Sequence, residues 1–397
     1  MRAFRRDGAV SWPPGRREQA RAFANDFRLT LASGVPYVLP NTAYALPSTV
    51  YLTPLGRGNR LELYEGTRRG WQVRSTAEIS VAVPSTLFRL FDVFAYWNSM
   101  TRAVTLEATN WDQSTAALTA ATAATPSVIT STAHGLSNGD LVGLAGLNNT
   151  VGTDATDGLN GTVWRVASVA ANTFEPEGSK CAGLVASTTG TWYKIPNTRT
   201  TALVAQDGRW CKTGDLSRLY LGSGMTMGVS GESETNFGGV DTPANWLLQN
   251  YYNRVEVVLR YSDSTDSWTY TTAAFRPANG RGKRARLGIV IGVNEEMVDA
   301  EAVHAATDSS AVPGATTVIL GIDLDGFATN DAQRLAIVAA TGNVVPMAAR
   351  YVGFPGIGAH FLGWIEYSDG AGLGVTTWYG DAGLAQQFTG IMARWRA

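Results

Sequence analysis

The histidines and a few acidic side chains are the residues of this 397-residue chain whose types could support chemistry. His134, His304 and His360 lie far apart in the sequence, and a lone histidine rarely makes a site. A paired-carboxylate glycosidase needs two carboxylates about 5 to 10 Å apart in a cleft, and Glu366 and Asp381 are the nearest candidates. Either of them could pair with His360. We expect the histidines to be structural and predict no catalytic residue.

The sequence contains only weak evidence for a metal site or a phosphate-binding loop. Asp140, Asp154 and Asp157 could gather around a Ca²⁺ ion, but their spacing is not that of an EF-hand. The glycines of residues 353–358 are not followed by the lysine and helix of a phosphate-binding loop. We therefore predict no metal site and no cofactor.

Composition narrows the class of protein. Charged residues make up 16% of the chain, glycines number 43 and the net charge is −1, which suits an all-β protein with surface buried between subunits. The near-zero charge argues against nucleic acid as the main partner. The basic run 281–286 is expected to be a solvated strand edge or to pair with acidic neighbours. No apolar run is long enough for a membrane span, and the N-terminus lacks a secretion signal. Cys181 and Cys211 are expected to be free thiols.

The elements that would position these residues begin with a predicted helix over residues 16–32. Ala20, Phe23, Phe27 and Leu31 follow the spacing of one helical stripe. Two interpretations stay open: the helix packs on its own domain, or it is an arm that docks on a neighbouring protein through Phe23, Phe27 and Leu31. A second, shorter helix is predicted around residues 245–250.

Residues 37–111 read as short strands separated by turns, which favours a sandwich or a strand-rich collar. In residues 88–93 both faces carry bulky side chains, so we expect that strand to be buried on both sides. The predicted strands are 49–53, 60–65, 70–75, 79–83, 87–96 and 102–107.

A low-complexity Ala/Thr run at residues 114–127 marks a boundary. The following phrases, HGL at 134–136, NGD at 138–140, LNG at 159–161 and NTFE at 172–175, resemble a small phage-associated β-barrel module. The resemblance implies a spacer or adhesion role. Leu141, Val142, Val163, Val166, Val169 and Phe174 are expected to fill the core of this module.

The flanking sequence supports an insertion. Each side of the module carries a Thr-Ala-Leu-like phrase, as if one strand region had been opened to admit it, and insertions are tolerated where chain ends lie close together. Residues 201–221 then read as a meander of three strands. The phrases at 202–226, 245–272 and 353–381 together resemble virion structural proteins of tailed bacteriophages, namely head fibres, collar spikes and tail-fibre proteins. The resemblance implies a homotrimer attached to the particle at one end.

Residues 361–367 and 375–379 are aromatic runs separated by a turn signal, which predicts a β-hairpin whose first strand is buried between two layers or two subunits. Trp364, Tyr367, Trp378 and Tyr379 are the candidate binding residues on it. Such rings could stack on host glycans, although burial between subunits is the favoured interpretation.

The sequence therefore predicts a mainly β protein with four parts. These are an N-terminal helical docking arm (1–45), a β-rich collar domain (46–118 and 196–240), an inserted small β-barrel (119–195) and a C-terminal antiparallel jelly-roll-like sandwich (241–397). The predicted function is a trimeric fibre or spike subunit of a virion, assembled in the host cytoplasm. It contacts other virion proteins through residues 1–45 and displays the sandwich outward for host attachment. Whether it sits on the head, neck or tail stays open, as do two alternatives: a depolymerase of host polysaccharide and a capsid-decoration protein.

Overall fold

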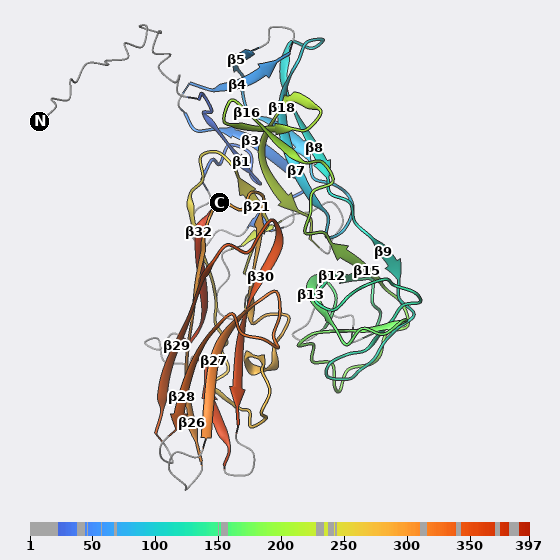
Figure 1. The fold of residues 1–397 in the computed structure, drawn as a ribbon, viewed down its shortest axis with the longest axis vertical. Helices are drawn as coiled ribbons and strands as arrows, with labels where there is room; N and C mark the ends of the chain where they lie inside the picture. The colour runs from blue at the N-terminus through green and yellow to red at the C-terminus, as the bar shows by residue number, and fades with distance from the viewer. Residues whose placement is uncertain are drawn as a thin grey trace, which may run out of the picture.

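The computed structural model describes residues 23–37, 44–45, 47–56, 58–66, 70–149, 151, 158–227, 234–236, 242, 244–309, 316–338, 343–369, 374–380 and 389–397. These residues form β-sheets joined by turns, and they contain no α-helix; a 3₁₀ turn, η2, spans Ala278–Gly280. No helix in this part of the chain is long and apolar enough to cross a membrane. Figure 1 shows three β units, which we call the N-terminal unit, the inserted unit and the C-terminal sandwich.

The N-terminal unit surrounds one core with three sheets. The central strand β7 has six consecutive buried residues, which confirms the prediction that both of its faces are covered. The meander predicted at residues 201–221 is also confirmed, because β16, β17 and β18 pair in order and β18 then pairs with β7. The strands are β1 (Phe27–Thr30), β3 (Thr49–Pro54) and β6 (Ile79–Ala82) in one sheet, β4 (Arg60–Glu65) and β5 (Gly70–Ser75) in a second, and β7 (Leu90–Asn98), β8 (Ala103–Asn110), β16 (Leu203–Gln206), β17 (Arg209–Lys212), β18 (Asp215–Met225) and β21 (Leu248–Asn250) in the third.

The predicted N-terminal helix is wrong where the structure can test it, because residues 27–30 form strand β1; residues 16–22 lie outside the described part of the chain. All of β1 is buried, and it pairs with β3 in antiparallel register. Asn250 fastens it further, since its Oδ1 accepts from the Leu29 amide at 2.6 Å and its Nδ2 donates to the Leu29 carbonyl at 3.1 Å. Phe27 and Leu31 lie in the core at 1% and 5% exposure. Their side chains are therefore not available to dock on another protein.

The inserted unit is a sheet of its own, with strand order β10-β11-β14-β13-β12-β15-β9. Val142, Val166 and Phe174 lie in its core and Val169 packs against it, as predicted. The prediction is wrong for Leu141 and Val163, which pack instead in a cluster shared with both neighbouring units. The strands are β9 (Thr115–Ala117), β10 (Ala120–Ala121), β11 (Ile129–Thr130), β12 (Leu141–Ala145), β13 (Thr162–Ala167), β14 (Thr173–Pro176) and β15 (Thr191–Ile195).

The C-terminal sandwich packs two sheets face to face, and the chain crosses repeatedly between them. The first sheet holds β2 (Tyr44–Ala45), β19 (Glu234–Asn236), β20 (Ala244–Trp246), β25 (Arg286–Ile291), β30 (Gly358–Ser368), β27 (Thr316–Leu324) and β28 (Ala332–Val338) in that order, with β24 (Arg276–Pro277) beside β30. The second holds β22 (Glu256–Tyr261), β32 (Gly390–Arg396), β26 (Val298–Asp308), β31 (Thr376–Tyr379), β23 (Ser267–Thr269) and β29 (Val345–Gly353), which pairs with β26. Pairing is antiparallel except between β20 and β25.

Two local predictions fail in the sandwich. The final aromatic runs do not form a hairpin: β30 pairs with β25 and β27 in one sheet, whereas β31 pairs with β26 and β23 in the other. The short helix predicted around residues 245–250 is replaced by β20 and β21, which belong to different units. The burial of β30 on both faces is confirmed, and within this chain it lies between two layers.

Candidate functional site

The predicted aromatic binding set does not form a surface site. Trp364 and Trp378 are both 0% exposed, and they face one another across the sandwich with His304 between them. The His304 ring lies 4.8 Å from the Trp364 ring and 4.9 Å from the Trp378 ring. The interpretation that these tryptophans contact glycan or a neighbouring subunit is therefore wrong. Tyr367 and Tyr379 are half-buried and reach the surface of the chain.

His304 is held neutral by this surrounding. Burial lowers its pKa from 6.5 to about 3. A third tryptophan ring, Trp268, lies 5.1 Å away. The histidine therefore acts as a flat apolar ring in the core, as expected of a structural residue.

Glu366 is fully buried beside the same cluster. Its carboxylate accepts from Trp268 Nε1 at 2.8 Å and from Arg276 Nε at 2.8 Å. Burial raises its pKa to about 7, and Arg276 opposes the shift. An enclosed carboxylate with bonded oxygens is not placed to attack a substrate or to activate water. The other glycosidase candidate, Asp381, lies outside the described residues.

The most connected polar site lies where the three units meet, on the segment that leaves the inserted unit. Arg199 in that segment donates through Nε to Asp92 Oδ2 of the N-terminal unit at 2.9 Å. Its Nη2 donates to the Tyr220 hydroxyl at 3.2 Å and to the Gly292 carbonyl of the C-terminal sandwich. Ser223 completes the network by donating to Asp92 Oδ1 at 2.5 Å. The Arg199 guanidinium thus bonds groups of the N-terminal unit and of the C-terminal sandwich. Arg199 itself lies in the segment that follows the last strand of the inserted unit.

A second polar contact joins the inserted unit to the sandwich. Arg165 Nε lies 3.7 Å from Glu177 Oε2, and its Nη1 lies 3.9 Å from Asp323 Oδ1 of the sandwich. The backbone of Phe327 also donates to Glu177, and Phe327 packs directly over Gly178. Burial raises the pKa of Asp323 to about 7.

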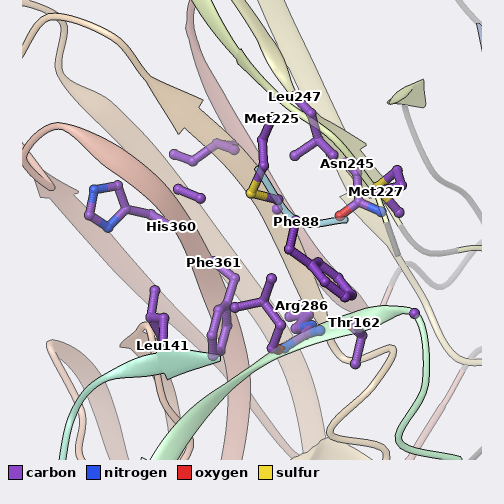
Figure 2. A pocket seen from close by; sticks show the side chains of 15 residues that line it. Phe88, Leu141, Thr162, Met225, Met227, Asn245, Leu247, Arg286, His360 and Phe361 are labelled. Atoms are coloured by element: carbon purple, nitrogen blue, oxygen red, sulfur yellow. The ribbon is translucent and has the colours of Figure 1, made fainter. Parts of the chain in front are cut away.

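An apolar cavity of about 50 Å³ is lined by residues of all three units, and Figure 2 shows its lining. Arg286 is buried there at 7% exposure, with its guanidinium 4.6 Å from the centre of the Phe361 ring, and it donates to the Val163 carbonyl. Burial lowers the pKa of Arg286 to about 9. The cavity has room for water-sized molecules only, so its lining serves to join the units.

A wider polar cleft of about 560 Å³ opens beside it, between the inserted unit and the sandwich. His360 Nδ1 lies 2.8 Å from Asp325 Oδ2, and Asp325 Oδ1 accepts from the Phe361 amide. The expected pairing of His360 with Glu366 is thus wrong. His360 Nε2 has no hydrogen-bond partner among the described residues. On the opposite wall Lys194 Nζ lies 2.7 Å from Asp140 Oδ2. The cleft is therefore lined by both acidic and basic side chains, and these are paired with one another.

The remaining candidates have structural partners. His134 donates from Nε2 to the Ala170 carbonyl at 3.0 Å and accepts at Nδ1 from the Leu136 amide, so its expected structural role is confirmed. Asp140 is paired with Lys194, while Asp154 and Asp157 lie outside the described residues. Cys181 and Cys211 form no disulfide, as expected, and both are buried.

In the basic run 281–286, the expected pairing with an acidic neighbour is confirmed for Arg281, whereas Arg286 does not lie on a solvated strand edge. Arg281 Nε lies 3.2 Å from Asp263 Oδ2, and Arg286 is the buried guanidinium beside the cavity. Across the residues that the structure describes, no group of three His, Cys, Asp or Glu residues could hold a metal ion.

Sequence reasoning missed the junction itself. Arg165 and Arg199 stand in no motif, and Arg286 ends the basic run 281–286. Each of the three makes a contact between units that no local pattern identifies. A possible signal was the insertion boundary, because a segment that returns from an inserted unit must be anchored where it rejoins its host.

No protein-family model matches the chain, and a search of curated proteins finds no match. Among solved structures, it is similar to the infectious bursal disease virus Gx strain at 9% identity and a TM-score of 0.20, covering 89% of this chain and 75% of that one. It is similar to the infectious bursal disease virus VP2 subviral particle at 10% identity and a TM-score of 0.19, covering 80% and 73%. The mosquito-larvicidal Cry4Aa toxin from Bacillus thuringiensis is similar at 5% identity and a TM-score of 0.17, covering 89% and 51%. At these TM-scores the likenesses carry no argument about fold or function.

Proposed function

We propose that the protein is a structural subunit of a virion, of the fibre or spike type, that holds three β units in a fixed relation. The observation that carries the proposal is the junction around Arg199. This guanidinium has only 9% of its side chain exposed, and it binds Asp92 of one unit and the Gly292 carbonyl of another. Burying a charge is costly unless it is paired, so the site favours one relative placement of the units. Rigid display of β units is what a particle appendage requires.

The tailed-phage phrases in the sequence support the virion part of this proposal. The resemblance implies assembly from identical copies, three in number, in the host cytoplasm, and attachment to other virion proteins through the first 45 residues. Phe27 and Leu31 are excluded from that attachment, because both side chains are committed to the core. Tyr367 and Tyr379 are the two members of the predicted glycan-binding set that reach the surface, so they are the ones proposed for host contact.

We propose a structural rather than a catalytic role. The alternative of a polysaccharide depolymerase finds no support in Glu366, whose carboxylate is bonded to Arg276 and Trp268 inside the sandwich. A capsid-decoration protein without host contact would need the same rigid junction. A decoration protein and a fibre or spike subunit differ in where they lie on the particle, so the location of the protein distinguishes the two.

Immunogold labelling tests the proposal directly. Antibodies raised against the purified chain are expected to label intact particles of the virus that encodes it, at one place on the head, neck or tail. Label spread evenly over the capsid would favour decoration instead. If the chain is absent from purified particles by mass spectrometry, the structural proposal fails.

A further inference from the structure

Strand β28 is the free edge of the first sheet of the C-terminal sandwich. One side of β28 pairs with β27 over seven residues without a register shift, from Ala332↔Ile322 to Val338↔Thr316. No strand in the described part of the chain pairs with its other side. A regular edge of this kind presents unpaired backbone N–H and C=O groups that suit another extended strand.

Two of the outward side chains of β28 are large and apolar. Leu335 and Ile337 are 52% and 56% exposed, although large aliphatic side chains gain free energy when they leave water. Leu335 lies opposite Ile319 of β27, and Ile319 lies opposite Tyr367 of β30. These three residues form an apolar row across the outer face of the sheet, and the row runs out to the β28 edge.

The neighbouring edge shows what β28 lacks. Strand β29, which lies beside β28, carries Pro346, and its Arg350 donates to Asp299 at 2.8 Å. Proline and charged side chains are the usual devices that keep an edge strand from pairing. Strand β28 contains no proline and one charged residue, Arg334. One margin of the sandwich thus has a protected edge and an unprotected edge.

We propose that β28 pairs antiparallel with β28 of a second copy of this chain, centred on Leu335. In that register Leu335 lies opposite its own symmetry mate, Gln333 opposite Ile337, and Arg334 opposite Ala336. No arginine then faces an arginine, and like charges directly opposite are the arrangement that would destabilise such a pair. Residues opposite one another in an antiparallel pair project from the same face, so the two apolar rows join into one. The strand is complementary to itself, which identifies a second copy as the partner.

This contact is two-fold, so it differs from the three-fold association implied by the phage resemblance. It rests on the edge of β28 and not on the proposed virion role. Its test is made on the purified protein in solution, without particles, so failure of one proposal is distinguishable from failure of the other.

Light scattering of the full chain carrying both L335K and I337K tests the pairing. In the proposed register L335K places two like charges directly opposite one another, and I337K adds a lysine on each side of them. The assembly mass is therefore expected to fall two-fold relative to the unchanged protein. The matched control carries V258K and M392K, which replace exposed apolar residues on the outer face of the other sheet, and its mass is expected not to change. An equal mass for all three proteins would overturn the proposal, as would an equal fall in the control.

A cysteine variant tests the register. Opposed residues of an antiparallel pair have Cα atoms about 4.5 to 5.5 Å apart, within the range that a disulfide can bridge. L335C is expected to form a disulfide-linked dimer on mild oxidation. M100C serves as the control, because Met100 is 91% exposed in the N-terminal unit. Cross-linking of L335C at no more than the M100C level would overturn the centred register.

Discussion

The Arg199 guanidinium lies 2.9 Å from the Asp92 carboxylate, with 9% and 3% of the two side chains exposed. Arg350 and Asp299 form a pair of almost the same length, 2.8 Å, with 59% and 13% exposed. The two pairs share their chemistry and distance and differ in their contact with water. The chain therefore contains its own comparison between a buried and an exposed ion pair.

Arg199→Ala is expected to lower the free energy of unfolding by about 3–5 kcal/mol, because it leaves Asp92 buried without its cation. Arg350→Ala is the matched control and is expected to have a much smaller effect, since water and Arg394 remain beside Asp299. Urea unfolding curves measure both. Equal effects would contradict the structural role given to the Arg199 junction.

Gly143→Ala is expected to loosen the packing of the inserted unit on the N-terminal unit. A Cβ at position 143 would lie 2.2 Å from the Phe88 ring, so the two units would have to separate or Phe88 would have to move. Gly66→Ala is the control, because a Cβ there meets nothing within 4 Å. Limited proteolysis should cleave the linkers of the inserted unit faster in the first variant. Identical digestion of both variants would show that this contact does not fix the unit.

Phe27→Ala is expected to destabilise the protein by about 3–5 kcal/mol, the usual range when a buried phenylalanine is truncated. Its side chain is 1% exposed in the core of the N-terminal unit. Phe23→Ala should cost less, since that ring is half-buried, 4.8 Å from the Tyr252 ring. Thermal unfolding measures both. A stable Phe27→Ala protein that no longer binds particles would instead restore the docking interpretation.

Acidification is expected to destabilise the sandwich through His304. Its pKa is lowered from 6.5 to about 3 in the folded protein, so the unfolded chain takes up the proton first. The stabilisation is complete above pH 6.5 and is lost as the pH falls towards 3, by about 1.4 kcal/mol per pH unit.

Glu366, bonded to Trp268 beside this histidine, titrates with the opposite sign, so the effect of His304 is isolated by comparison with H304F. The free energy of unfolding of the unchanged protein should fall below that of H304F as the pH drops from 6.5 to 4. Parallel curves would mean that His304 is not held neutral.

The strand content of the N-terminal unit could be predicted from the sequence, because turn residues and β-rich runs are local signals. The helix over residues 16–32 failed for a definite reason. Phe27 and Leu31 are four residues apart, which fits one helical face, but four is an even number and also fits one face of a strand. Leu29 lies between them in the same core, and this alternation with Arg28 and Thr30 was the signal for a strand.

The contacts of the tryptophan cluster and of the junction between the units could not be predicted, because they join residues that are far apart in the sequence. Trp364 and Trp378 look like neighbours on a hairpin, yet they face one another from opposite sheets, because each strand finds other partners far away in the sequence. Alanines on β26, such as Ala302 and Ala306, lie in the same core and leave space for the tryptophans. Arg165, Arg199 and Arg286 meet their partners in the neighbouring units only once the units are packed together.

The first and last strands of the inserted unit are side by side, with Thr115 of β9 opposite Tyr193 of β15. Its two ends therefore emerge at the same place. A folding chain must bring β18 to β7 across the whole of this unit, and the entropic cost of closing a loop grows with its length. If the inserted unit folds first, it replaces a long flexible loop by a short rigid connection. Prior folding of the inserted unit would then speed the assembly of the sheet that the unit interrupts, by lowering the effective contact order of that sheet.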